Sequence, residues 1–221
     1  MQGGGSYQSD EVRAFLERSD AIITNPPFSV WEDFITWCID SKKKFLIIGN
    51  GCIVFNKQVF KFYREGLVRY GFNRNKAMWF EVGEGYDYQK EEDGKKYGKV
   101  SGVSWFSNLP VPNNSFDSGI LYQEDAYRKY DNFDALHIDK TNRIPMDYDG
   151  LMGVPITYLN KHDETKFEIV GLFNGYSQPQ PEKGLFCGEK IDTFFQGKIT
   201  PFRGPVIDNQ ALYARLLIKK K

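Results

Sequence analysis

Metal-binding and disulfide-forming residues are scarce in this chain of 221 residues. Its three cysteines, Cys38, Cys52 and Cys187, are odd in number and not spaced as a CxxC pair, and neither His137 nor His162 lies near them in sequence. We therefore expect reduced thiols, no zinc or other metal site, and a cytoplasmic location. No Ser-His-Asp or Cys-His set is obvious, so nothing indicates catalysis by an activated nucleophile.

Long apolar runs and a net charge are also absent. The longest apolar runs, such as 45–48, have the length of a strand rather than of a membrane span, and the first twenty residues lack the order of a signal peptide. Lys plus Arg and Asp plus Glu both number 29, so the formal net charge is zero. With 41% hydrophobic residues the chain can bury a core. We expect a globular protein with no membrane partner, most simply one domain with an appended lobe.

The most informative segment is Asn25-Pro26-Pro27-Phe28, which directly follows the apolar run 21–24. Two adjacent prolines fix φ and remove two backbone donors, so neither a strand nor a helix continues through them. One interpretation is an ordinary turn at the end of a strand. The other is a binding site, because open α/β sheets bind ligands at the carboxyl ends of their strands.

The chemistry of this segment suits an adenine base. In the extended backbone that the prolines impose, the Asn25 side-chain oxygen and the Pro26 carbonyl can both accept hydrogen bonds from one amino group. Phe28 can offer a flat face to the base that carries this amine. The segment therefore predicts an adenine-binding clamp.

A helix is expected directly after the clamp, from Ser29 to about Ser41. Ser29 is the expected N-cap and Glu32 completes a capping box, while the apolar residues that follow repeat at helical spacing. A second buried strand is expected at 44–48, ended by the turn 49–51. Strand, helix and strand in this order imply a parallel, right-handed crossover.

Cations are concentrated in residues 41–76. This stretch contains nine Lys or Arg residues and one acidic residue, Glu65, so its charge is +8. A stretch of this kind can be a solvated face. It also interleaves with aromatic residues, a mixture suited to phosphate contact beside exposed bases. Acidic residues gather in 81–93 and 131–149, which we expect to face away from a polyanion. The residues expected to contact DNA are Lys42, Lys43, Lys57, Lys61, Arg64, Arg69, Arg74 and Lys76; Lys44 completes the nine.

Other local patterns predict further elements in the first half. Short helices are expected at 10–18 and at 57–65, the second with Asn56 as its cap and Gly66 as its terminator. Strands are expected at 77–82 and 100–106, with a polar loop between them. Trp105 and Phe106 are expected in the core of the second strand rather than in base stacking.

The second half predicts short strands after a Pro- and Asn-rich linker at 108–115. Segments 151–159 and 167–172 are expected to pair with each other. A hairpin is expected to join 204–207 to 212–218 through a turn at 208–210. The expected result is a β-rich lobe.

Several segments of the chain resemble a known family, the EcoRI-type modification methyltransferases, which transfer a methyl group from S-adenosylmethionine to adenine in DNA. The resemblance runs from about residue 6 to the C-terminus. It is carried by SDAIITNPPFSVWEDF, KKKFLIIGN, VSWFSNL, KYDNFDALHIDK, IPMDYDGLMGVPITYL, FEIVGL and LYARLLIKKK. Of these, IPMDYDGLMGVPITYL, with Tyr148, Asp149 and Met152, is typical of the EcoRI branch.

The resemblance implies an α/β fold, namely the second half of a Rossmann-like methyltransferase sheet with a β-rich C-terminal lobe. Residues 1–107 would be the C-terminal half of the catalytic domain, and 108–221 a lobe for recognising the DNA target. Asn25, Pro26, Pro27 and Phe28 would be the catalytic motif that binds an adenine flipped out of the duplex. The implied cofactor is S-adenosylmethionine, the partner is double-stranded DNA, and the setting is restriction-modification in a bacterial or phage-infected cell.

The chain departs from this family at its amino terminus. A glycine-rich loop after a first strand, followed by an acidic residue after the second, is expected to hold the cofactor, and the chain shows neither. Gly3-Gly4-Gly5 follows no apolar strand. We therefore expect the cofactor half of the sheet to be missing and assign no cofactor-binding residue. The chain could be a piece of a longer enzyme, be completed by a second polypeptide, or be a degenerate relative, so independent activity stays open.

Two other functions stay open. The chain could be a nucleic-acid-binding protein without catalysis, for example a viral one, or a methyltransferase that acts on a protein or small-molecule amine. The candidates in the second half for contacts with base edges or phosphates are polar side chains. They are Asn113, Asn114, Arg128, Lys129, Asn132, Lys140 and Arg143.

Overall fold

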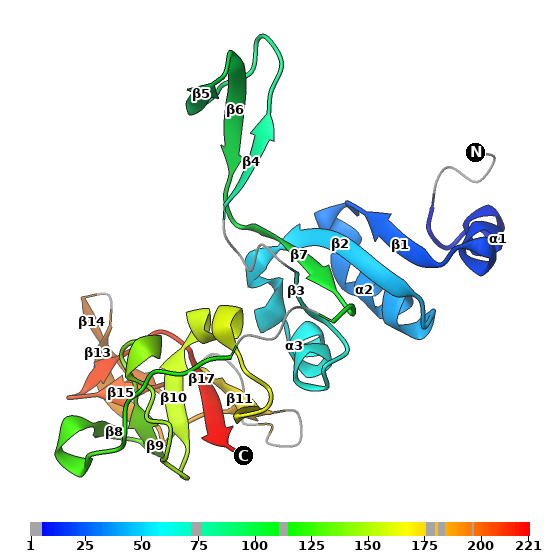
Figure 1. Ribbon diagram of the computed structural model, residues 1–221. Coiled ribbons are helices and arrows are strands. Elements are labelled where there is room, and N and C mark those ends of the chain that lie inside the picture. Colours follow the sequence, from blue (N-terminus) through cyan, green and yellow to red (C-terminus); the bar gives the residue numbers. More distant parts are fainter. Residues whose placement is uncertain (1–5, 72–76, 111–114, 176–179, 181–183, 196) are drawn as a thin grey trace. The chain divides into compact units, whose positions relative to one another are not determined.

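The computed structural model describes residues 6–71, 77–110, 115–175, 180, 184–195 and 197–221 (Figure 1). The chain divides into two compact units, Met1–Val111 and Pro112–Lys221. The architecture is mixed α/β with many strands and few helices. Among the described residues, the second unit has strands and short 3-10 turns but no α-helix. No helix of the described part is both long enough and apolar enough to cross a membrane.

The first unit is built on a four-stranded sheet. In spatial order its strands are β1 (Ala21–Thr24), β2 (Lys44–Asn50), β7 (Val103–Ser107) and β3 (Arg69–Tyr70). Strands β1 and β2, which α2 (Trp31–Asp40) connects, are parallel as expected, whereas β7 is antiparallel to both β2 and β3. Strand β2 runs two residues past its expected end at Ile48.

Buried aromatic rings join the helices of this unit to one face of the sheet. Trp31 on α2 contacts Phe106 on β7, Phe106 contacts Tyr70 on β3, and Tyr70 contacts Tyr63 on α3 (Lys57–Arg64), with ring centroids 5.0–5.8 Å apart. All four side chains are at most 8% exposed. Since edge contacts between aromatic rings add to the burial of their area, these rings form the centre of the core.

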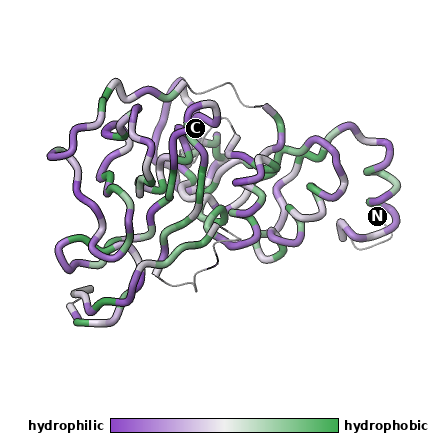
Figure 2. Tube along the Cα trace, turned by 90° about the horizontal axis from the view of Figure 1, so that it is seen from below, coloured by the Kyte–Doolittle hydropathy of each residue, from purple (hydrophilic) through white to green (hydrophobic). Residues whose placement is uncertain are grey.

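The predicted cap at Asn56 is confirmed, and Ser9 is a further cap that was not predicted. The Ser9 hydroxyl accepts from the Val12 amide at the start of α1 (Asp10–Arg18), and the Asn56 side chain accepts from the Gln58 amide at the start of α3. Gly66 ends α3 with a φ of +70°, where a side chain would be strained. Helix α1 has no buried residue, and Figure 2 shows hydrophilic residues predominating along it near the N label.

The start of α2 differs from its prediction. The chain leaving Pro27 first makes a 3-10 turn, η1 (Phe28–Val30), in which the Val30 amide donates to the Pro27 carbonyl at 3.2 Å. Ser29 lies inside this turn, so it does not cap the helix, and the capping box with Glu32 is wrong. The N-cap of α2 is Val30, which makes no side-chain hydrogen bond.

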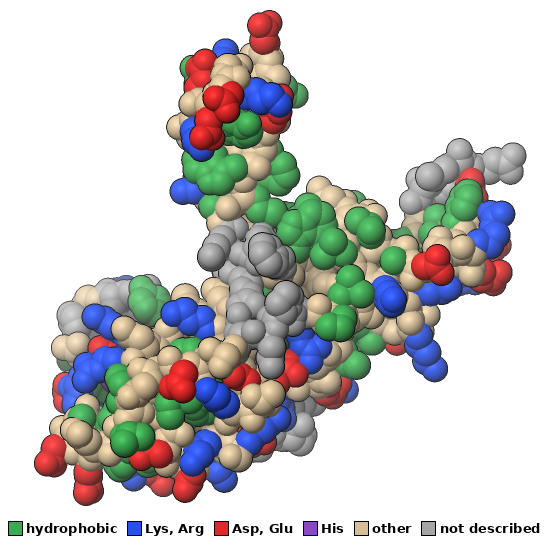
Figure 3. Space-filling model, in the orientation of Figure 1, with side chains coloured by type: hydrophobic (Ala, Val, Ile, Leu, Met, Phe, Trp, Pro, Cys, Tyr) green, Lys and Arg blue, Asp and Glu red, His purple; other side chains and the backbone are tan. Residues whose placement is uncertain are grey.

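The expected long loop between two strands was wrong. Residues 78–100 form a three-stranded sheet of β4 (Met78–Glu81), β6 (Lys95–Val100) and β5 (Lys90–Glu92), in that order. Strand β4 pairs with β6, which was expected to be mostly loop, and β7 pairs with β2 instead. Gly102, with a φ of +76°, lets the chain turn from one sheet to the other. Carboxylates and exposed hydrophobic side chains lie side by side on the small sheet (Figure 3).

The second unit contains a six-stranded sheet with β17 near its centre. In spatial order the strands are β12 (Leu185–Phe186), β11 (Phe167–Phe173), β17 (Arg215–Lys220), β10 (Met152–Pro155), β9 (Phe133–His137) and β8 (Arg128–Tyr130). The predicted pairing of 151–159 with 167–172 is wrong, because β10 and β11 both pair with β17, one on each side. Residues 216–218 of β17 are fully buried, so this strand is the more apolar partner for both.

A smaller four-stranded sheet completes this unit, with the order β14 (Lys198–Phe202), β13 (Ile191–Phe195), β16 (Gln210–Ala211) and β15 (Val206–Ile207). The turn at Asp208 and Asn209 is confirmed, both with positive φ, but it joins β15 to β16 rather than to 212–218. Residues 111–114 of the expected linker lie outside the described residues. The remaining 3-10 turns are η2 (Gly51–Phe55), η3 (Glu124–Ala126), η4 (Thr141–Arg143) and η5 (Ile156–Lys161).

Candidate functional site

The clamp segment lies at the carboxyl end of β1. The pairing of β1 with β2 ends at Thr24, opposite Ile47, and the chain then enters the two prolines. Pro26 is buried, whereas Asn25, Pro27 and Phe28 are exposed, and half of the Phe28 surface is accessible. The backbone is thus held from one side while the polar and aromatic groups face outward.

Two hydrogen-bond acceptors of this segment are available. The Pro27 carbonyl is used within the turn, because it accepts from the Val30 amide. In contrast, the Asn25 side chain and the Pro26 carbonyl have no hydrogen-bond partner among the described residues. These two acceptors are the pair that the sequence predicts for an amino group.

The neighbouring carboxyl end of β2 is rigidly held. The Asn50 side-chain oxygen accepts from the Cys52 amide at 2.8 Å, and the Gly51 amide donates to the Gly102 carbonyl at 2.8 Å. The buried Tyr70 hydroxyl donates to the Gly51 carbonyl at 2.6 Å. Burial raises the pKa of Tyr70 far above its ordinary value, so the hydroxyl stays protonated as a donor. Because β1 and β2 are parallel, this end lies at the same edge of the sheet as the clamp.

The cations expected to contact DNA have different environments. Lys43 is engaged inside the fold, where its Nζ donates to the Ser19 carbonyl at 2.8 Å, at the end of α1. The Arg69 guanidinium donates to the Gly66 carbonyl at 2.9 Å, and Lys61 lies 4.0 Å from the Glu65 carboxylate. The side chains of Lys42, Lys57 and Arg64 are exposed, whereas Arg74 and Lys76 lie outside the described residues.

The candidates in the second half are mostly engaged as well. Asn132 is 5% exposed, and its amide nitrogen donates to the carbonyls of Glu189 and Gly204, each at 2.9 Å, so it is a structural residue. Arg128 pairs with Asp208 and Arg143 lies 3.7 Å from Asp139. Lys140 is exposed, and Asn113 and Asn114 lie outside the described residues.

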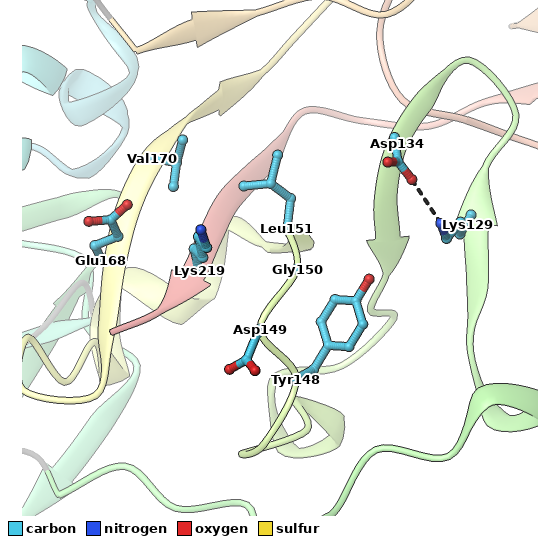
Figure 4. Close-up of a pocket in the computed structure, with 9 residues that line it drawn as sticks. All are labelled: Lys129, Asp134, Tyr148, Asp149, Gly150, Leu151, Glu168, Val170 and Lys219. Atoms are coloured by element: carbon cyan, nitrogen blue, oxygen red, sulfur yellow. Dashed lines mark hydrogen bonds and ion pairs between the residues drawn. The ribbon is translucent and has the colours of Figure 1, made fainter.

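A pocket of about 470 Å³ opens on the six-stranded sheet of the second unit (Figure 4). Lys129 donates to Asp134 at 2.8 Å at its edge, and this bond raises the pKa of the lysine. The pocket has three carboxylates and two lysines, and Asp149 also lies 3.4 Å from the Nζ of Lys220, so charges of both signs surround it. Its polar and charged lining residues are Lys129, Asp134, Tyr148, Asp149, Glu168 and Lys219.

The pocket brings together residues that the sequence analysis had singled out separately. Lys129 was a candidate for DNA contact, and Tyr148 and Asp149 belong to the segment typical of the EcoRI branch. Met152, from the same segment, is fully buried in β10 and has a structural role. Sequence reasoning missed Glu168 and Lys219, which lie opposite each other on β11 and β17 and become neighbours only through that strand pairing.

Known proteins resemble the chain over all or most of its length. It matches the family described as "Adenine-specific methyltransferase EcoRI" over residues 1–221. It is 35% identical to a type II methyltransferase of Mycoplasma genitalium, over all of this chain and 71% of that protein. It is 37% identical to M.MpnI of Mycoplasma pneumoniae, over 80% of this chain and 59% of that protein. It is 34% identical to M.EcoRI of Escherichia coli, over 87% of this chain and 61% of that protein. The chain thus spans less than two thirds of the length of these last two relatives. No solved structure gave a significant match.

Proposed function

This chain belongs to the EcoRI family of adenine-specific methyltransferases, and we propose that it carries the adenine clamp and DNA-binding part of an enzyme that methylates the exocyclic amine of adenine in double-stranded DNA. The observation that supports this most directly is the pair of available acceptors at Asn25 and Pro26, beside the exposed ring of Phe28. The parallel unit of β1, α2 and β2 fits the partial Rossmann-like sheet expected from the sequence.

The clamp can promote methylation without a general base of unusual pKa. The lone pair of the adenine amine is delocalised into the ring, which makes the nitrogen a poor nucleophile. The Asn25 side-chain oxygen and the Pro26 carbonyl would each accept one amine hydrogen, and together they favour a tetrahedral nitrogen with a localised lone pair. Because the nitrogen becomes tetrahedral only as it attacks, this stabilisation grows toward the transition state.

Phe28 would hold the base in place during this step. Its half-exposed ring can stack on an adenine that has left the duplex, which offsets part of the cost of unstacking that base. S-adenosylmethionine, when bound, would supply the electrophilic methyl group. The residues described here fit the amine that accepts the methyl group, and none of them is assigned to the methyl donor.

DNA contact would involve exposed cations on the first unit and the β-rich second unit. Lys42, Lys57 and Arg64 are exposed and remain candidates for phosphate contact, together with Arg74 and Lys76. Lys43 is proposed only as a support for α1, because its ammonium group is already bound to the Ser19 carbonyl. The second unit is proposed to recognise the target sequence.

The test is methyl transfer by Asn25→Ala. The full-length protein would be purified from a host without adenine methylation, incubated with S-adenosylmethionine and duplex DNA, and N6-methyladenine measured by mass spectrometry. Loss of one acceptor should reduce the rate about 100-fold or more, as for other groups that stabilise a transition state. Asn142→Ala, at an exposed asparagine of η4, is the matched control and should keep wild-type activity.

The outcomes separate the alternatives. Full activity in a folded Asn25→Ala protein would refute the role of the clamp. A wild-type protein that binds DNA with sequence preference but transfers no methyl group would instead be a nucleic-acid-binding protein without catalysis. Methylation of a protein or small amine, with no DNA affinity, would indicate the third function.

A further inference from the structure

The first residue of α2 ties the clamp to the neighbouring strand. Trp31 follows Phe28 by three residues and is 1% exposed. Its indole Nε1 donates a hydrogen bond of 2.8 Å to the Ile48 carbonyl on β2. The pairing of β1 with β2 ends one residue earlier, at Ile47. The indole therefore donates its hydrogen bond to a carbonyl of β2 that lies just beyond the end of β1.

The space around this indole is closely fitted. A Cβ atom at Gly49 would lie 2.4 Å from the Trp31 Nε1 and 2.5 Å from its Cε2, so a side chain at this position cannot coexist with the indole in its present place. The Trp31 ring also packs against the fully buried Phe106 ring, and the two ring centroids are 5.0 Å apart. A tryptophan at this position therefore requires glycine at position 49, and both positions belong to segments that carry the family resemblance.

Other hydrogen bonds also hold the start of α2. Its N-cap, Val30, has no side-chain hydrogen bond, and the turn η1 between the clamp and the helix is closed by backbone bonds from the Val30 amide to the Pro27 carbonyl at 3.2 Å and from the Trp31 amide to the Phe28 carbonyl. The next residue, Glu32, accepts from the Asn56 side chain at 2.6 Å and so links α2 to the start of α3. The strand pairing that ends at Thr24 holds the start of the clamp beside β2, and the Trp31 indole holds the other end, the η1 turn, to the same strand.

We propose that Trp31 is a positioning residue for adenine methylation, which acts through its bond to the Ile48 carbonyl and its fit against Gly49. This proposal rests on the proposed function of the clamp. Trp31 fixes the η1 turn, and with it the Phe28 ring and the Asn25 and Pro26 acceptors, at a set distance from the carboxyl end of β2. The indole itself does not contact the substrate. Loss of the bond would let the turn shift, so that the acceptors would no longer meet the amine in the geometry of the transition state.

Trp31→Phe tests this directly, since it keeps an aromatic ring in the core and removes the donor. At a temperature at which the variant is fully folded, kcat should fall about 10- to 100-fold, while KM for DNA should change much less. Trp37→Phe is the matched control, because Trp37 lies on the same helix but packs against Tyr7 and Phe34 instead. The control should keep its kcat.

A double variant tests the fit against Gly49. Gly49→Ala alone should displace the indole and lower kcat strongly, because its Cβ would overlap with the indole. In the Trp31→Phe background the same change meets a smaller ring and should cost much less. If the two losses simply multiply, the close fit between these residues does not control the clamp and the proposal is overturned.

A readout that needs no activity separates this proposal from the function on which it rests. Fluorine NMR of para-fluorophenylalanine placed at position 28 reports the position of the clamp ring. Trp31→Phe should shift or split this resonance, and Trp37→Phe should leave it unchanged. An unchanged resonance, or a changed one with unchanged kcat, would overturn the proposal. A wild-type protein without methyl transfer would overturn the proposed function, while the resonance would still decide whether Trp31 positions Phe28.

Discussion

Replacing Asn132 should destabilise the second unit and leave sequence-specific DNA binding by the folded protein unchanged. Its type and sequence context made it a candidate for reading bases. In the structure its amide nitrogen instead donates to the carbonyls of Glu189 and Gly204, both at 2.9 Å, and only 5% of the residue is exposed. The Glu189 amide also donates to the Asn132 carbonyl at 2.9 Å. The side chain therefore joins the turn between β8 and β9 to two segments of the smaller sheet, the one that precedes β13 and the one that connects β14 to β15.

The magnitude follows from the two hydrogen bonds. A hydrogen bond makes a net contribution of about 1 kcal/mol to stability, and Asn132→Ala also leaves two carbonyls without a hydrogen-bond donor. This substitution should therefore lower the free energy of unfolding by about 2–3 kcal/mol. Asn132→Asp should cost about 3–5 kcal/mol at neutral pH, because a buried carboxylate would face two carbonyl oxygens with no donor. Aspartate is nearly isosteric with asparagine, so the larger loss would identify the donor function rather than the volume as the cause.

The placement of tryptophan in the chain helps the assay. All four tryptophans lie in the first unit, so their fluorescence in a urea titration reports that unit, while far-UV circular dichroism reports both. The Asn132 variants should shift the dichroism transition to lower urea, and should accelerate hydrogen exchange at the Glu189 amide. Asn142→Ala, at an exposed position, is the control. It should change neither the dichroism transition nor the hydrogen exchange of the Glu189 amide. If the Asn132 variants keep wild-type stability but lose sequence preference in DNA binding, this reasoning is refuted. Asn132 would then be a residue that contacts bases.

Two further predictions concern pH and the clamp. Burial, with help from Arg215 and Arg128, lowers the pKa of His137 from 6.5 to about 4, so only the unfolded chain takes up this proton as the pH falls through that range. The free energy of unfolding should therefore decrease by about 1–2 kcal/mol between these pH values, and His137→Gln should flatten this part of a urea-titration pH profile. Pro27→Ala restores a backbone N–H two residues after Asn25, and the Asn25 side-chain oxygen should then accept a hydrogen bond from it. The rate of methyl transfer should fall about tenfold, because this oxygen is no longer available to the adenine amine. A wild-type rate would contradict this.

Elements whose formation depends on neighbouring residues were predictable from the sequence. Asn56 caps α3, Gly66 ends it, and the turn at 208–209 lies where it was expected. In each case the deciding interaction spans only a few residues, so the sequence pattern contains both partners. Ser29 is the exception, because the two prolines before it impose a 3-10 turn that moves the helix start to Trp31.

Strand partners were not predictable in the same way. Strands β10 and β11 each have the pattern of a hairpin arm, and nothing local indicates that β17, some fifty to sixty residues away in sequence, lies between them. Likewise, the polar composition of 90–100 indicates a loop, yet β6 pairs with β4 on a sheet whose strands are mainly exposed. Strand pairing depends on which apolar faces are buried together, which is a property of the whole unit.

The same distinction holds for the site. The position of the clamp at the end of β1 could be predicted, because prolines end a strand by a local mechanism. The bond from Trp31 to Ile48 could not, since it joins residues that only the folded sheet brings together. A tryptophan at the start of a helix and a glycine at the end of the next strand were visible as separate features, but their fit is visible only in three dimensions.

The two prolines explain why the clamp acceptors remain available for a ligand. Asparagine near a turn usually turns its side-chain oxygen back to the amide two residues ahead. Asn50 does this with Cys52, and Asn56 does it with Gln58, at 2.8 and 2.9 Å. Asn25 cannot, because position 27 is a proline and has no amide hydrogen, and the proline at 26 removes the next nearest donor. The tetrapeptide thus removes the donor that usually satisfies such an asparagine, and an amino group from outside the chain can take its place.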